Sequence, residues 1–147
     1  MIRVKPFLQL AVGVLTLLVL ISCASEEIPP LPTITDTEEE AGVVRGSYSW
    51  EDGDRATTTN APSPDILVSD QKELVVQPGE TIYVTFPEAP LEQKLGIWKY
   101  GSGSFQTSID GSYEAPKEPG EYNYGLFSTW DEGTAIFAWK IIVAEER

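Results

Sequence analysis

The stretch "EYNYGLFSTWDEGTAIFAWKIIV", Glu121 to Val143, contains two segments that alternate with a period of two around a short acidic turn. In the second segment, Phe137, Trp139 and Ile141 follow one another at intervals of two residues. This period is typical of β-strands, because successive side chains of a strand point to opposite faces of the sheet. The intervening "DEG" is typical of a tight connection. The stretch therefore predicts two strands joined by a turn.

Other segments from Val43 onward have the same period, and glycine or proline separates them. "VVRGSYSW" predicts a strand with Val44, Tyr48 and Trp50 on one face. Further strands are predicted at "DILV", "ELVV", "TIYVTF", "KLGIWKY" and "SFQTSI". No window of about eleven residues keeps a helical apolar stripe. About eight short strands predict an all-β fold, an immunoglobulin-like antiparallel β-sandwich over residues 43–147, with a small β-barrel as the alternative.

The N-terminus has the pattern of a secretory signal peptide over residues 1–22. Arg3 and Lys5 precede the apolar run from Phe7 to Ile21. As a helix this run spans only about 22 Å, which is shorter than the roughly 30 Å hydrocarbon core of a bilayer. A permanent membrane span is therefore the weaker interpretation.

The only cysteine of the chain follows directly, in "LISC". This motif resembles the bacterial lipobox, which implies that Cys23 receives a diacylglyceryl thioether and becomes the first residue of the mature chain. The alternative is an ordinary secretory signal with an incidental buried cysteine. Acyl chains such as palmitate can hold a small domain on a membrane. We therefore expect a lipid-anchored protein on the extracytoplasmic face of the cell membrane.

Residues 23–42 are predicted to form a disordered tether between the lipidated cysteine and the folded domain. The segment "ASEEIPPLPTITDTEEEA", Ala24 to Ala41, is rich in Glu, Pro and Thr and shows neither strand nor helix period. Its prolines favour an extended backbone, and its carboxylates repel one another. This composition is typical of a spacer.

Charge and composition exclude several functions. The formal net charge is −13, and the chain has no histidine. Nucleic acid is not an expected partner, because binding it requires Lys and Arg. Without histidine there is no Ser-His-Asp or Cys-His arrangement and no His-ligated zinc. Only a carboxylate pair of the glycosidase kind stays formally possible. We therefore expect neither an enzyme nor a cofactor.

Two acidic turns, "WEDGD" and "WDEG", follow Trp50 and Trp130. Carboxylates of Asp52, Asp54, Asp131 and Glu132 could together hold Ca²⁺ if the turns came close. Neither turn has the EF-hand spacing, and Asp-Gly and Glu-Gly pairs are also typical of tight connections. We expect the turns to be structural and predict no metal site.

Aromatic residues are numerous, with four Trp, six Tyr and five Phe. Most should be buried in the core. In "IWKYGSGSF" the neighbouring Trp98 and Tyr100 flank a lysine and precede a glycine-serine loop. These rings either bind a ligand at one end of the sandwich or divide between core and rim. Trp98, Tyr100 and Trp130 are the candidate binding residues.

Several motifs together resemble a group of small, functionally uncharacterised lipoproteins of Gram-positive bacteria: "GSYSW", "APSPDILV", "LVVQPGETIYVTF" and "GEYNYGLFSTWDEGTAIFAWKIIV". The resemblance covers most of Val43 to Val143. Related chains often have a cysteine between the Tyr and Trp of the first motif. This chain has Ser49 there, so the disulfide of those relatives is absent.

These observations predict a non-enzymatic, membrane-anchored domain that binds an envelope protein or glycan through loops at its end. One alternative is a protease inhibitor, because "GEYNYGLFSTWDEG" is loosely similar to the last strand pair of chagasin-type inhibitors. The "NPTTG"-like loop of that family is missing. The other alternative is a structural component of the envelope.

Overall fold

The computed structural model describes residues 28–145, and its central feature is the hairpin of β10 (Gly120–Trp130) and β11 (Gly133–Val143). The two strands pair along their whole length, from Gly120 opposite Val143 to Trp130 opposite Gly133. The strand pair and turn predicted from the sequence are therefore confirmed. The predicted signal peptide and Cys23 lie outside the described residues.

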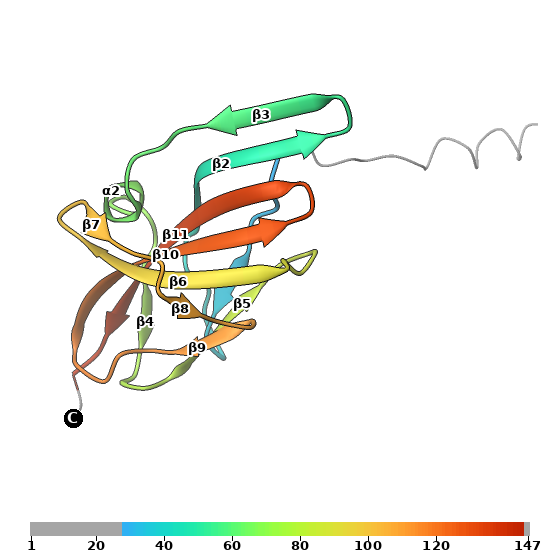
Figure 1. The fold of residues 1–147 in the computed structure, drawn as a ribbon. Coiled ribbons are helices and arrows are strands. Elements are labelled where there is room, and N and C mark those ends of the chain that lie inside the picture. Colours follow the sequence, from blue (N-terminus) through green and yellow to red (C-terminus); the bar gives the residue numbers. More distant parts are fainter. Residues whose placement is uncertain (1–27, 146–147) are drawn as a thin grey trace, which may run out of the picture.

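The hairpin belongs to the larger of two sheets (Figure 1), with the strand order β3-β2-β11-β10-β6-β7. β8 also pairs with β6, and β4 pairs with the end of β11 in the parallel direction. The other strands of this sheet are β2 (Val44–Asp52), β3 (Arg55–Thr59), β4 (Leu74–Val76), β6 (Glu92–Lys99), β7 (Ser102–Gly103) and β8 (Thr107–Ser108).

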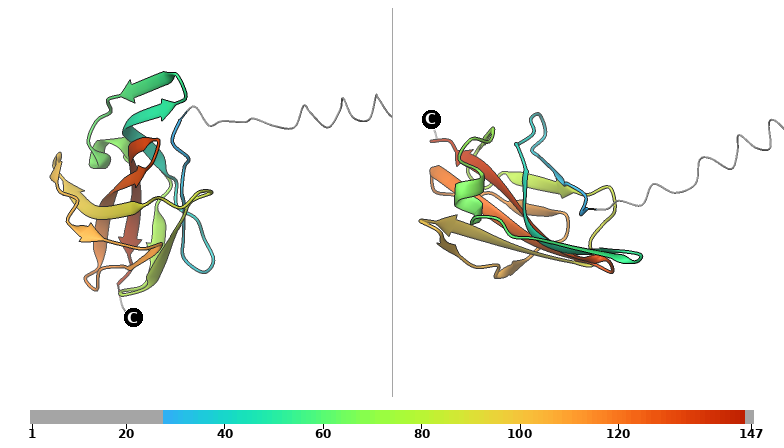
Figure 2. Two further views of the ribbon diagram at one scale, coloured as in Figure 1. Left: turned by 45° about the vertical axis from the view of Figure 1, so that its right-hand side comes forward. Right: turned by 90° about the horizontal axis from the view of Figure 1, so that it is seen from above.

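The smaller sheet has the order β1-β5-β9, with β1 (Thr33–Thr35), β5 (Thr81–Thr85) and β9 (Ser112–Glu114). Figure 2 shows the two sheets from two further directions. Neither sheet closes on itself, so the barrel alternative is wrong. The all-β, sandwich-like architecture is confirmed.

The core lies between the sheets and contains residues from both. β11 contributes Phe137, Trp139 and Ile141, which are completely buried, and β1 and β5 contribute Ile34 and Ile82. The indole Nε1 of Trp139 donates a hydrogen bond of 2.9 Å to the hydroxyl of Tyr113. Burial raises the pKa of Tyr113 well above its ordinary value, so this hydroxyl stays protonated.

The predicted tether is wrong for the part that the structure describes. β1 lies within it and pairs with β5, and Ile34 is completely buried. The chain then turns back, because the carboxylate of Asp36 accepts hydrogen bonds of 2.7 Å from the amides of Glu38 and Glu39. The folded domain therefore begins before residue 43.

"DILV" is not a strand. Pro64–Leu67 forms a single helical turn, α2, which packs on β10 and β11. Pro64 stands at the start of this helix, where its missing amide costs nothing, and Asp65 lies in the first turn. Val68 and the β11 residue Ala138 are completely buried. The helix therefore covers part of the outer face of the larger sheet.

The predicted face of β2 is correct only for Tyr48 and Trp50. Tyr48 pairs with Ala135, but Arg45 pairs with Phe137, so β2 has one extra residue at a bulge. A bulge of this kind reverses the alternation of side chains. Val44 therefore points away from the core.

No helix among residues 28–145 has both the length and the apolar composition of a membrane span.

The burial of Ile34 gives a direct test of the corrected domain boundary. We predict that Ile34→Ala lowers the free energy of unfolding by about 2–4 kcal/mol, because it leaves a cavity in the core. The measurement is denaturant unfolding. Thr33→Ala, an exposed change in the same strand, is the control and should cost less than about 1 kcal/mol. Equal small effects of both changes would mean that this segment is a spacer after all.

Candidate functional site

The three aromatic residues predicted from the sequence lie in different surroundings. Trp98 and Trp130 are buried, with exposed fractions of 7% and 4%, whereas Tyr100 is 98% exposed. Only Tyr100 is therefore available to contact another molecule. Trp98 and Tyr100 belong to the same hairpin, but Trp130 lies at the other end of the sheet.

Trp130 is part of the core. Its Nε1 donates a hydrogen bond of 3.0 Å to the carbonyl oxygen of Glu88. Its ring makes edge-to-face contacts with Trp50 and Phe86, with centroids 5.5 and 5.1 Å apart. This side chain therefore holds the turn of β10 and β11 in place from within the core.

Trp98 is buried on the outer face of the larger sheet. Its ring centroid lies 4.5 Å from that of Phe105, which in turn lies 5.7 Å from Phe127. Gly103 on β7 allows this close packing, because a Cβ there would lie only 2.5 Å from the indole. The packing of the Trp98 ring thus stabilises the β6–β7 hairpin.

Tyr100 stands at the turn of that hairpin, in an unusual backbone conformation. Tyr100 and Gly101 have φ angles of 52° and 75°, the positive pair that is typical of type I′ turns. Tyr100 is the only residue other than glycine with positive φ among residues 28–145. This conformation costs an L-residue about 1–2 kcal/mol, and asparagine or glycine is preferred there. Because the ring is fully exposed, it gains no free energy of burial that would offset this cost.

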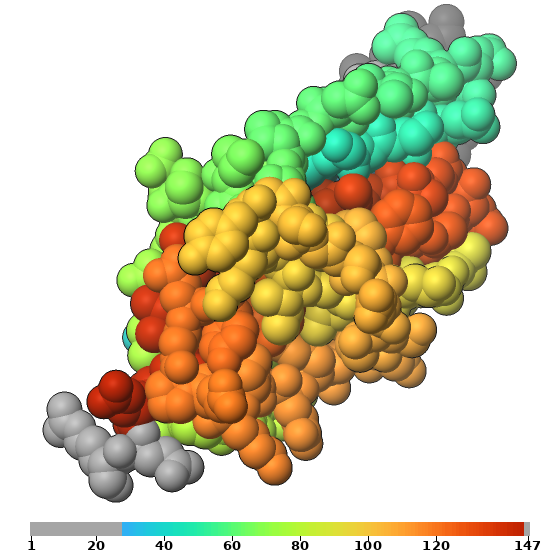
Figure 3. All heavy atoms as spheres, turned by 60° about the vertical axis from the view of Figure 1, so that its left-hand side comes forward, coloured from blue at the N-terminus to red at the C-terminus, as the bar shows by residue number. Residues whose placement is uncertain are grey.

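Asp65 of α2 holds the turn from the side. Its carboxylate accepts a hydrogen bond of 2.7 Å from the hydroxyl of Ser63 and another of 2.7 Å from the amide of Gly101. These two bonds, that from Ser63 first, keep the pKa of Asp65 below its ordinary value. We call residues Lys99–Ser102, together with the hydrogen bond from Gly101 to Asp65, the Tyr100 turn. Figure 3 shows residues of this region at the surface, beside those of α2.

The role of Asp65 is not among the predictions made from the sequence. The signal was present as Ser63-Pro64-Asp65, an order that is typical of the start of a helix. The short apolar run that follows was interpreted as a strand. Ile66, on the same helical turn, is 57% exposed and adds an apolar side chain to this end of the molecule.

The two acidic turns lie side by side, and the amide of Glu51 donates a hydrogen bond of 2.8 Å to the carbonyl of Glu132. Gly53 has a left-handed φ of 59°, as the turn interpretation requires. Gly133 allows close backbone approach, since a Cβ there would lie 2.0 Å from the carbonyl oxygen of Ser49. Within residues 28–145, no group of three or more acidic side chains is placed to hold a metal ion.

No family model, curated protein or solved structure matches this chain.

The Asp65 bond to the turn predicts a pH effect with a defined sign. A carboxyl whose pKa is depressed in the folded state keeps its hydrogen bonds above that pKa and loses them as the pH falls through it. We expect the NMR shift of the Gly101 amide proton to titrate with a midpoint below the usual aspartate value of 3.8. Asp65→Asn should abolish this titration and accelerate hydrogen exchange at Gly101 roughly fivefold. Asp70→Asn, an exposed change outside α2, should alter neither. A midpoint at or above 3.8 would contradict the role of Asp65.

Proposed function

We propose that the chain is a membrane-anchored extracytoplasmic lipoprotein, and that its domain binds an envelope protein or glycan through the Tyr100 turn without catalysing a reaction. The observation that carries this proposal is the combination of full exposure and positive φ at Tyr100. A residue that costs stability and gains no burial suggests retention for contact with another molecule. Tyrosine is also among the residues that contribute most to binding at interfaces.

The sheet order supports an immunoglobulin-like class for this domain. The order β1-β5-β9 matches the neighbours A, B and E of that fold, and β11-β10-β6 matches G, F and C. Tyr122, near the start of β10, donates a hydrogen bond of 2.8 Å from its hydroxyl to the carbonyl of Glu118. This bond corresponds to the tyrosine corner at the start of strand F. In this comparison the β2–β3 hairpin and α2 are insertions between the strands that match A and B.

The position of the Tyr100 turn suits a domain held by its N-terminus. The described chain begins on one side of the molecule, and the β6–β7 turn lies on the other side, next to α2 (Figures 1 and 2). From Cys23 to Ile28 the chain reaches at most about 18 Å. With lipid attached at Cys23, the domain would stand close to the membrane and present the turn away from its anchor.

The binding proposal predicts opposite effects of one substitution on stability and on binding. Tyr100→Asn should raise the free energy of unfolding by about 0.5–1 kcal/mol, because asparagine tolerates positive φ. It should also reduce recovery of the bound partner from detergent-solubilised envelope at least tenfold. Denaturant unfolding and a quantitative pull-down are the measurements.

Tyr83→Asn is the matched control, since Tyr83 is a partly exposed tyrosine on β5. It should not be stabilising and should leave capture unchanged. Equal partner yield from wild type and Tyr100→Asn would contradict the role of the turn. A protease as the captured partner would favour inhibition, and no partner with wild type would favour a structural component of the envelope.

The anchor is tested separately. We expect mass spectrometry of the native protein to show an acylated N-terminal Cys23, and Cys23→Ser to release the protein from the membrane fraction. The reason is that several acyl chains provide most of the membrane affinity of such a protein. Recovery of Cys23→Ser still firmly embedded in the membrane would count against lipid attachment.

A further inference from the structure

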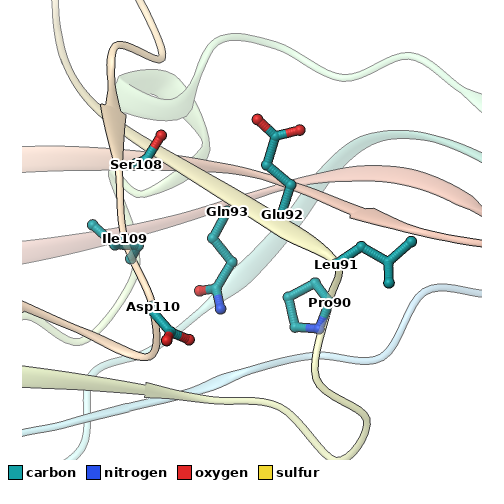
Figure 4. Close-up of a pocket in the computed structure, with 7 residues that line it drawn as sticks. All are labelled: Pro90, Leu91, Glu92, Gln93, Ser108, Ile109 and Asp110. Atoms are coloured by element: carbon teal, nitrogen blue, oxygen red, sulfur yellow. The ribbon is translucent and has the colours of Figure 1, made fainter.

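An open groove of about 340 Å³ lies at the end of β6 opposite to the Tyr100 turn (Figure 4). One wall is the start of β6, and the other is the segment that leaves β8 for the smaller sheet. The amide of Ile109 donates a hydrogen bond of 3.1 Å to the carbonyl of Gln93 and joins the two walls. The lining residues are Pro90, Leu91, Glu92, Gln93, Ser108, Ile109 and Asp110.

Gln93 is the unusual member of this groove. Its residue is 7% exposed, and its Oε1 is buried without a hydrogen-bond partner within the described part of the chain. The same is true of the hydroxyl of Ser128, which lies opposite Gln93 on β10. Buried polar atoms in folded proteins are normally hydrogen-bonded. In Figure 4 the amide of Gln93 extends between Pro90 and Asp110. Its oxygen is covered in this conformation, so a donor in the groove would reach it after a rotation of the side chain.

The walls define the chemistry of that donor. Pro90, Leu91 and Ile109 are apolar, and Leu91 is 71% exposed. Glu92 and Asp110 are acidic, and no basic residue lines the groove. The nearby Lys94 is directed to Glu92, with 3.3 Å between Nζ and Oε1. The groove thus combines a buried acceptor, a carboxylate and apolar sides in a chain of net charge −13.

We infer that this groove binds a primary alkylammonium group, such as the side chain of a lysine. An ammonium supplies three donors and no acceptor, so it can satisfy Gln93 Oε1 and pair with Asp110 at the same time. The methylene groups that carry the ammonium would lie along Pro90, Leu91 and Ile109, as lysine stems do on apolar surfaces. A neutral sugar hydroxyl could satisfy the amide but would leave the carboxylate without a counter-charge. This site is separate from the Tyr100 turn and does not depend on the function proposed for it.

The test is an NMR titration of the full chain in detergent, observed at the side-chain amide of Gln93 and the backbone amide of Ile109. The probe is Nα-acetyl-lysine amide, and the neutral control is Nα-acetyl-norleucine amide, which has the same carbon chain without the ammonium. We expect saturable shifts with the lysine probe, with a Kd on the order of 1–10 mM, and none with the norleucine probe. Butylammonium distinguishes the source of the amine. Weaker binding than the lysine probe indicates a peptide lysine, and equal binding indicates a free amine.

Two variants test the contacts. Asp110→Asn, a change at an exposed residue, should weaken binding of the lysine probe about tenfold, whereas Asp70→Asn should change it less than about twofold, through general charge alone. Gln93→Met keeps the volume of the side chain and removes the acceptor. It should abolish binding while raising the melting temperature, because a buried polar atom without a partner is lost. If Gln93 had a purely structural role, Gln93→Met would lower the melting temperature instead.

Three results would overturn the inference. Equal shifts with the norleucine probe would show that the groove recognises only the apolar chain. No shift with any amine at about 50 mM, which is about fifty times the lower expected Kd, would show that water alone satisfies the oxygen of Gln93. Shifts with methyl glucoside at concentrations where the lysine probe is silent would assign the groove to neutral sugars instead.

Discussion

Burial of β11 on both of its faces is the constraint on which the rest of this structure depends. Its inner face places Phe137, Trp139 and Ile141 in the core, and its outer face places Ala138 under α2. The strand also pairs with β10 along its length, with β2 along its first half and with β4 at its end. Because four elements converge on one strand, most apolar side chains near it are used for packing. This explains why Trp130, a candidate for binding in the sequence, belongs to the framework.

The packing around β11 determines which side chains are left at the surface for other roles. β6 pairs with β10 from Glu92 to Trp98, and its two ends carry two features that packing does not explain. At one end, Tyr100 adopts positive φ without burial. At the other, Gln93 is buried, and its oxygen has no hydrogen-bond partner among residues 28–145. Each feature lowers stability in a different way, one through backbone strain and the other through desolvation. Both are the kind of cost that binding sites typically carry.

The acidic composition fits this arrangement. A surface of net charge −13 disfavours phosphate polymers and anionic lipid headgroups and favours cationic partners. Carboxylates have several distinct roles in the described residues. Asp36 closes a turn, Asp65 holds the Tyr100 turn, and Asp110 lines the groove. Sequence alone gives all of them the same appearance, because a carboxylate takes its role from the donors that surround it.

The sequence by itself determined the features that depend on local pattern. Period-two alternation specified most strands and the β10–β11 turn, and the absence of histidine limited the available chemistry, because these properties need no information about distant contacts. Tertiary structure decided the rest. Ile34 became a core residue because β5 pairs with its segment, although a single apolar residue among threonines and prolines gave too weak a pattern to predict a strand. Pro64–Leu67 became helical because Pro64 and the following Val68 are buried on the outer face of the sheet, while a four-residue apolar run fits either state. The burial of Trp98, the exposure of Tyr100 and the groove around Gln93 all depend on which segments lie against β6, and no spacing along the chain contains that information.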